Sequence, residues 1–150
     1  MPPAPDPSTA TFRQTTPSRI SALEGLVRTL SDWCAAGGVP AATVSRLVLV
    51  LDELFTNIVI HGYRNDPQGD ILVEAALRDG AVDVTLTDHA PPFNPLTVPA
   101  TDTTLPLEAR SLGGLGLLFV RNKSDELSYQ LEHPDTPAAA NRLRFTVRFD

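Results

Sequence analysis

Apolar residues recur at helical spacing along residues 44–63. Positions about 3.6 residues apart share one face of a helix, and the run is too long for a buried strand. Its apolar members are Val44, Leu47, Val48, Leu51, Phe55, Ile58 and Val59. Glu53 and Asn57 lie inside this run, four residues apart, so they share one helical face about one turn apart. The pattern predicts a central helix that presents a carboxylate and a carboxamide together, which is also compatible with an ordinary polar stripe.

A second helical pattern starts at Ser18 and ends at Gly37 and Gly38. Its apolar side consists of Ile20, Leu23, Leu26, Val27, Leu30 and Cys34. Ser21 and Glu24 have the spacing of a capping box, which favours a helix start at this point.

Downstream of a turn cluster at residues 65–69 the hydrophobic period changes from 3.6 to about 2, which predicts strands. The expected strands are 71–77, 81–87, 127–131 and 143–149, with a short edge strand at 11–15. In the second of these, Val82, Val84 and Leu86 should face inward, and Asp83, Thr85 and Thr87 outward. Helices followed by antiparallel hairpins predict an α+β fold, with helices on one face of a mixed, mostly antiparallel sheet.

The 150 residues suit one domain, with residues 1–10 expected to form a loose tail. The net charge of −6 argues against a nucleic-acid-binding protein, which would need a basic face. A single cysteine, no membrane-length apolar run and no signal-peptide pattern predict a cytoplasmic protein without a membrane anchor. Residues 91–112 have no period, and such long irregular segments are often functional.

Two further stretches carry candidate ligand contacts. Asp88 ends an apolar strand, where it could accept a hydrogen bond from a ligand amino group or simply open a proline turn. Gly113, Gly114 and Gly116 precede an apolar helical stretch, and glycines before a helix can bring backbone N–H groups close to phosphates. The spacing matches neither the Walker loop nor the dinucleotide-binding loop, and a flexible loop tip is the alternative.

Together these stretches resemble the N, G1 and G2 boxes of the GHKL ATP-binding superfamily, which includes gyrase, Hsp90, histidine kinases and MutL. Within it, the helix sequence from Asp52 to Tyr63 is similar to that of stand-alone anti-sigma-factor serine kinases of the RsbW and SpoIIAB type. The segment from Pro91 to Pro95 resembles the stretch that follows the aspartate in those proteins. The resemblance covers about residues 18–149 and implies the two-layer Bergerat fold.

The resemblance also implies a site for ATP and Mg²⁺. Asn57 would ligate Mg²⁺, Glu53 would be the general base, and Asp88 would hold the adenine amino group. Residues 91–112 would form the lid. The other residues of the expected nucleotide site are His61, Ala90, Phe93, Arg110, Gly113, Gly114, Leu115 and Gly116. For two of these an ordinary role stays open: Arg110 as a solvated loop residue and His61 as a helix-terminal residue.

One position departs from the family pattern. The G1 box reads Asp-x-Gly, whereas Ala90 occupies the third position here. An alanine resists a positive φ or a close ligand approach, so it would weaken nucleotide binding unless its φ is negative.

The leading interpretation is an ATP-dependent serine/threonine kinase that sequesters a sigma factor and phosphorylates a STAS-type antagonist. The alternative is a nucleotide-gated or nucleotide-free binding regulator of the same fold without catalysis, which Ala90 favours. An ATPase detached from a larger machine is a third and weaker interpretation. Related proteins often dimerise, so a homodimer is also an expectation.

Overall fold

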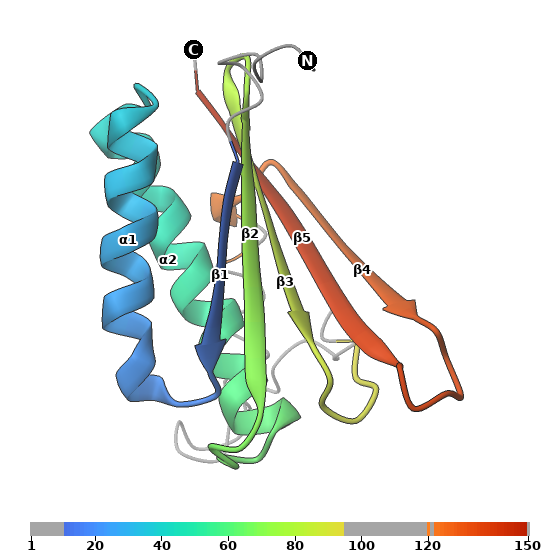
Figure 1. Cartoon of the computed structure of the whole chain (residues 1–150). Helices are drawn as coiled ribbons and strands as arrows, with labels where there is room; N and C mark the ends of the chain where they lie inside the picture. Colours follow the sequence, from blue (N-terminus) through green and yellow to red (C-terminus); the bar gives the residue numbers. More distant parts are fainter. Residues whose placement is uncertain (1–10, 95–119, 121, 150) are drawn as a thin grey trace, which may run out of the picture.

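The computed structural model describes residues 11–94, 120 and 122–149. Two helices pack on one face of a five-stranded sheet, which confirms the expected α+β sandwich (Figure 1). The elements are β1 (Thr11–Pro17), a 3₁₀ turn η2 (Ile20–Ala22), α1 (Leu23–Ala36), α2 (Ala41–Asn57), a π-helical turn η3 (Ile58–Gly62), β2 (Asp70–Arg78), β3 (Ala81–Asp88), β4 (Glu126–Glu132) and β5 (Ala140–Arg148).

The strand order is β1-β2-β3-β5-β4, so β3 lies at the centre of the sheet. Every strand pairing in the described part of the chain is antiparallel, so the mixed component expected from the sequence is not found there. Asp88, the last residue of β3, is paired with Ile71 on β2 and with Asn141 on β5. The end of the central strand is therefore flanked on both sides.

The core lies between the helices and the inner sheet face. Leu26, Leu30 and Cys34 are fully buried at four-residue spacing along α1, and Leu47, Leu51 and Phe55 follow the same spacing along α2. The inward strand residues are as expected, with Val82, Val84 and Leu86 fully buried. Burial raises the pKa of Cys34 to about 11, which fits a core side chain rather than a reactive thiol.

The start of the first helix differs from the expectation. Residues Ile20–Ala22 form a 3₁₀ turn, and α1 begins at Leu23 with no side-chain capping hydrogen bond. Ser21 therefore does not form the expected capping box, and Glu24 instead lies 3.7 Å from Arg28 in an i,i+4 ion pair. Ile20 is 46% exposed because the 3₁₀ turn places it outside the apolar face of α1.

The central helix changes geometry where the site residues begin. Pro40 caps α2 through its carbonyl, which accepts hydrogen bonds from Thr43 and Val44. Regular α-helix ends at Asn57, and the chain continues in the π-helical turn to Gly62. The N–H of Tyr63 donates to the carbonyl of Ile58 at 2.8 Å, a bond that spans five residues. The wider turn ends at Gly62.

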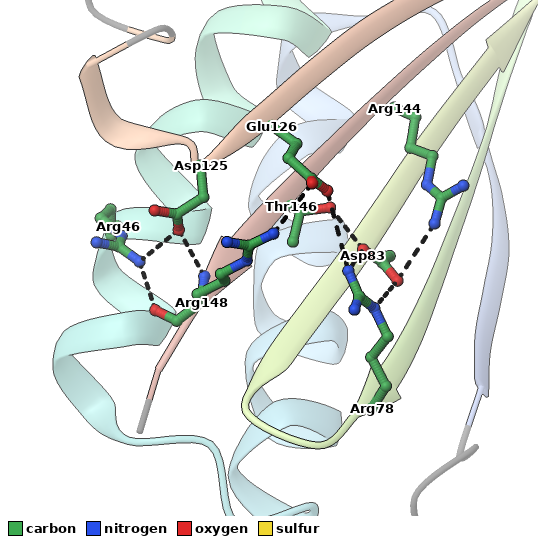
Figure 2. A network of polar contacts seen from close by, with 8 residues as sticks. All are labelled: Arg46, Arg78, Asp83, Asp125, Glu126, Arg144, Thr146 and Arg148. Carbon is green, nitrogen blue, oxygen red and sulfur yellow. Dashed lines mark hydrogen bonds and ion pairs between the residues drawn. The ribbon is translucent and has the colours of Figure 1, made fainter.

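The outer face of the sheet carries a network of charged side chains (Figure 2). Asp83 points outward as expected, yet it is only 7% exposed. Arg78 donates to it at 2.6 Å, Arg144 lies 3.4 Å from it, and the hydroxyl of Thr146 also donates to it. Burial of this carboxylate is thus compensated by neighbours on the two adjacent strands, Arg78 on β2 and Arg144 and Thr146 on β5.

Candidate functional site

Asp88 lies buried at the end of β3, with 3% of its surface exposed. Its Oδ1 atom accepts hydrogen bonds from the backbone N–H of Ala90 at 3.0 Å and from the amide Nδ2 of Asn141 at 2.9 Å. No group in the described part of the chain donates to Oδ2. Burial is the largest influence on the pKa of Asp88 and raises it, against the opposing effects of Asn141, Ala90 and His89. One carboxylate oxygen is therefore fixed while the other is available to a donor.

A small pocket, with a cavity volume of about 20 Å³ between the described residues, lies beside Asp88. Its floor and walls come from both layers of the sandwich. The described residues that line it are Leu54, Asn57, Ile58, Gly62, Asp88, Pro91, Phe93, Asn141 and Leu143. The polar groups of Asn57, Asp88 and Asn141 thus lie among apolar walls.

Asn57 is the second polar group that lacks a partner in this pocket. Its side chain is 8% exposed and makes no hydrogen bond to any part of the chain that the structure describes. The oxygen of an amide is also a ligand that Mg²⁺ accepts, so Asn57 and Asp88 fit a magnesium-bound nucleotide.

Metal ligands are sparse elsewhere in the described residues, which contain no cluster of three or more His, Cys, Asp and Glu side chains that could hold a metal ion.

Glu53 and His61 do not belong to the described lining of this pocket. Glu53 is half-buried on α2, one turn before Asn57, and its pKa is raised by burial and, second, by the charge of Asp52. A raised pKa suits a proton acceptor, which works best near the ambient pH. His61 is exposed within the π-helical turn.

Ala90 adopts a backbone conformation that an alanine tolerates. It is absent from the four described non-glycine residues with positive φ, so its φ lies in the ordinary region. Its side chain is 5% exposed, and a Cβ atom placed on Gly62 would lie 3.3 Å from the Cβ of Ala90. The methyl group of Ala90 therefore packs against the π-helical turn, next to Gly62.

The structure adds three residues that sequence reasoning missed. Asn141 contacts Asp88 from β5, Tyr129 donates from β4 to Oδ1 of Asn141, and Tyr63 joins the ends of two strands. The Tyr63 hydroxyl donates to the carbonyl of Asp70 at 2.7 Å and accepts from the N–H of His89 at 2.8 Å. The inward alternation of Leu143, Phe145 and Val147, extended back by two residues, would have placed Asn141 on the inner face.

The remaining sequence-predicted site residues lie outside the described residues. They are Arg110, Gly113, Gly114, Leu115 and Gly116, together with most of the expected lid at 91–112. The structure thus brings together Asn57, Asp88 and Phe93 of the expected set, with Ala90 behind them.

A larger hollow, with a volume of about 390 Å³, lies on the opposite face of the sheet. Its charged residues are mostly paired: Arg13 lies 3.7 Å from Glu74, and Arg144 lies 3.4 Å from Asp83. Because unpaired polar groups occur in the smaller pocket instead, we assign the candidate site to that pocket. No helix among the described residues is long and apolar enough to cross a membrane.

Comparison with known proteins agrees with this geometry. The family described as histidine kinase-like ATPase domain matches residues 16–146. An anti-sigma F factor of Geobacillus sp. (strain WCH70) is 32% identical over 91 residues, which are 59% of this chain and 61% of that protein. An anti-sigma F factor of Shouchella clausii is 28% identical over 113 residues, or 73% of this chain and 76% of that protein. The match to the Geobacillus protein thus spans about three-fifths of its length.

Solved structures share the fold. The crystal structure of the RsbU and RsbW domains of a Mycobacterium tuberculosis protein superimposes with a TM-score of 0.64 at 22% identity, covering 94% of this chain and 33% of that one. The SiaB–SiaC complex from Pseudomonas aeruginosa gives a TM-score of 0.63 at 19% identity, covering 93% and 90%. With a family match over most of its length and the fold of these structures, the chain belongs to the histidine kinase-like ATPase domain family.

Proposed function

We propose that this protein is an ATP-dependent anti-sigma-factor serine/threonine kinase. The observation that carries the proposal is the presence of Asp88 and Asn57 at one pocket, where Asp88 Oδ2 and the Asn57 amide make no hydrogen bond to the described residues. A carboxylate oxygen suits the amino group of adenine, and an amide oxygen suits Mg²⁺. The anti-sigma F factors among its relatives support the regulatory role.

In this proposal each residue of the site has a separate role in phosphoryl transfer. Asp88 and Phe93 bind the base, and Asn57 holds Mg²⁺, which would neutralise phosphate charge. Gly113, Gly114, Leu115 and Gly116 would supply N–H groups to the phosphates, with Arg110 as a further charge partner. Transfer of this kind depends mainly on positioning and charge neutralisation.

Glu53 is the general base in this proposal and accepts the proton of the serine hydroxyl. As the serine oxygen of the protein substrate forms its bond to the γ-phosphorus, the bond from that phosphorus to the ADP oxygen breaks, and Glu53 accepts the hydroxyl proton. The raised pKa of Glu53 supports this assignment. We propose a STAS-domain antagonist as the phosphorylated protein, a sigma factor as the sequestered one, a cytoplasmic location and a homodimeric state.

The test measures binding and transfer separately. Mg-ATP at about 100 times its Kd should stabilise the native protein by about 2.7 kcal/mol, which raises Tm by about 5–10 °C for a chain of this size. Asn57→Ala should abolish most of the difference between ATP with and without Mg²⁺. Glu53→Gln should retain the Tm shift but lose transfer of labelled phosphate to a STAS-domain protein, with Asp32→Asn on the exposed side of α1 as the control. Equal ATP affinities with and without Mg²⁺ in the native protein would contradict the role of Asn57.

A catalytically inactive, nucleotide-gated regulator is the second candidate. It is favoured by the position of Glu53, which is not among the described residues of the pocket wall. A normal Tm shift together with no phosphate transfer in the native protein would select this candidate. Transfer that survives Glu53→Gln would instead remove Glu53 from the proposed role.

A further inference from the structure

Asn141 makes more polar contacts around the pocket than any other side chain in the described part of the chain. It is 4% exposed at the start of β5. Its Nδ2 group donates to Asp88 Oδ1 at 2.9 Å, to the carbonyl of Ala90 at 3.0 Å and to that of Pro91 at 3.4 Å. Its Oδ1 atom accepts from the N–H of Phe93 at 3.1 Å and from the Tyr129 hydroxyl. One carboxamide thus joins the end of β3, the chain that leaves it, and β4.

These contacts fix the orientation of the amide. Two carbonyl groups and a carboxylate surround Nδ2, and all three can only accept when Asp88 is ionised. Two donors surround Oδ1. The opposite orientation would place donor against donor and acceptor against acceptor, so the side chain has one satisfactory arrangement.

The same contacts decide which oxygen of Asp88 faces the pocket. Oδ1 is occupied by two donors, Ala90 N–H and Asn141 Nδ2, whereas Oδ2 receives none from the described residues. Without Asn141, the carboxylate would lose one of these two donors and could rotate. Phe93 would also lose the side chain that holds its N–H at the pocket wall.

We propose that Asn141 is a positioning residue that holds Asp88 and the segment from Ala90 to Phe93 in the arrangement that binds the nucleotide base. It acts by donating to Oδ1 of Asp88, which leaves Oδ2 as the acceptor for an amino group of the base. This inference rests on the proposed nucleotide site. By fixing Oδ2 of Asp88 as an acceptor, Asn141 on β5 would favour bases that present an amino group to this oxygen over bases that present a carbonyl group to it.

The test uses two nearly isosteric variants. In Asn141→Asp the new carboxyl group can still accept from Phe93 and Tyr129, but it donates to Asp88 only while protonated. Two carboxyl groups this close share one proton at low pH and repel each other once both ionise. Asn141→Leu keeps the volume and cannot donate at any pH. Gln130→Glu on the exposed face of β4 is the control for added charge.

ATP affinity is measured for the four proteins from about pH 5.5 to about pH 8.5, with GTP as the competing base. Asn141→Asp should bind ATP within about threefold of the native protein at the acid end and at least tenfold more weakly at the alkaline end, since a hydrogen bond to a charged group contributes this much. Asn141→Leu should bind at least tenfold more weakly throughout, with a smaller preference for ATP over GTP. Native protein and Gln130→Glu should share one pH profile. The other titratable groups near Asp88 are His89, Tyr63 and Tyr129, and the native profile contains their effect.

A second readout needs no nucleotide. The amide-exchange protection factor of Phe93 should fall at least tenfold in Asn141→Leu, and in Asn141→Asp only at alkaline pH. Should Asn141→Leu fail to fold, Tyr129→Phe replaces it. Both ATP affinity and the protection factor of Phe93 should then fall, but by less than in Asn141→Leu. If both Asn141 variants lost ATP affinity equally at every pH, Asn141 would be a packing residue only, and the inference would be overturned. If the native protein bound no ATP, the proposed function would fail, and protection of Phe93 that is unchanged in both variants would overturn the positioning role as well.

Discussion

At the scale of single residues, Ala90 shows how a departure from a family pattern can be accommodated. The resemblance raised the concern that a methyl group at this position would obstruct the backbone or the ligand. In the structure Ala90 has an ordinary φ, its N–H donates to Asp88, and its carbonyl accepts from Asn141. Its methyl group points toward Gly62 rather than replacing a contact of Asp88.

We therefore expect Ala90→Gly to reduce stability without improving binding. The variant loses a buried methyl group and gains freedom in the unfolded chain, which together cost about 1–2 kcal/mol. Urea unfolding measures the stability, and a titration with Mg-ATP measures the affinity, which should stay within about threefold of native. Tighter binding by tenfold or more in Ala90→Gly would show that the methyl group obstructs the nucleotide.

At the scale of elements, the outer sheet face is held by ion pairs as well as by backbone pairing (Figure 2). Burial is the largest single influence on the pKa of Asp83 and raises it. The hydrogen bonds from Arg78 and Thr146, with the charges of Arg78 and Arg144, outweigh burial, so the pKa is lowered. An acid whose folded pKa is lowered stabilises the folded state above its unfolded pKa and loses that effect as pH falls through the folded value.

Asp83→Asn should therefore cost about 1–2 kcal/mol near pH 7, a modest figure because both arginines are about half exposed. The difference from native should narrow as pH falls below 3.8, the ordinary pKa of an aspartate. Chemical unfolding at a series of pH values measures this, with Asp32→Asn on the exposed side of α1 as the control. A difference between native and variant that stays constant down to about pH 2 would contradict the assignment.

The elements themselves were largely predictable from sequence, because the changes of period from 3.6 to 2 reflect which face meets the core. The strands differ from prediction mainly in their ends: β5 starts at Ala140 rather than at residue 143. Asn141 was missed for this reason, since a polar residue at an inward position ended the apolar pattern early. The π-helical turn and the 3₁₀ start of α1 were also not predictable, because both depend on packing against the sheet rather than on local spacing.

Part of the candidate site could also be predicted from the sequence. Asn57, Asp88 and Phe93 were identified by resemblance, and the structure places them at one pocket. Their hydrogen-bond partners come from β4 and β5, far along the chain, and no local pattern encodes such contacts. The burial of Asp83 on an otherwise solvent-facing side of the sheet was missed because it requires arginines from two other positions in the sheet register.

At the scale of the whole molecule, the site is maintained at the expense of stability. Asp88 is buried, and its raised pKa means that the ionised carboxylate is less favourable in the folded chain than in the unfolded one. For an acid whose folded pKa is raised, this cost is present above the folded pKa and disappears as pH falls below the unfolded value. Binding of a ligand that donates a hydrogen bond to Asp88 would reduce this cost.

The variant Asp88→Asn tests whether the ionised carboxylate lowers stability while it supports nucleotide binding. The new side chain keeps Oδ1 as the acceptor for Ala90 and Asn141, and it replaces Oδ2 with a donor. Without nucleotide, the variant should therefore be as stable as native or more stable near pH 7, with the gain shrinking in acid. With Mg-ATP the order should reverse: native Tm rises by about 5–10 °C, and the variant, which presents a donor to the adenine amino group, shows little shift. Thermal unfolding of both proteins with and without Mg-ATP measures all four values. A variant that is clearly less stable without nucleotide would mean that the ionised Asp88 supports the fold, and an equal shift with Mg-ATP would mean that it does not contact the base.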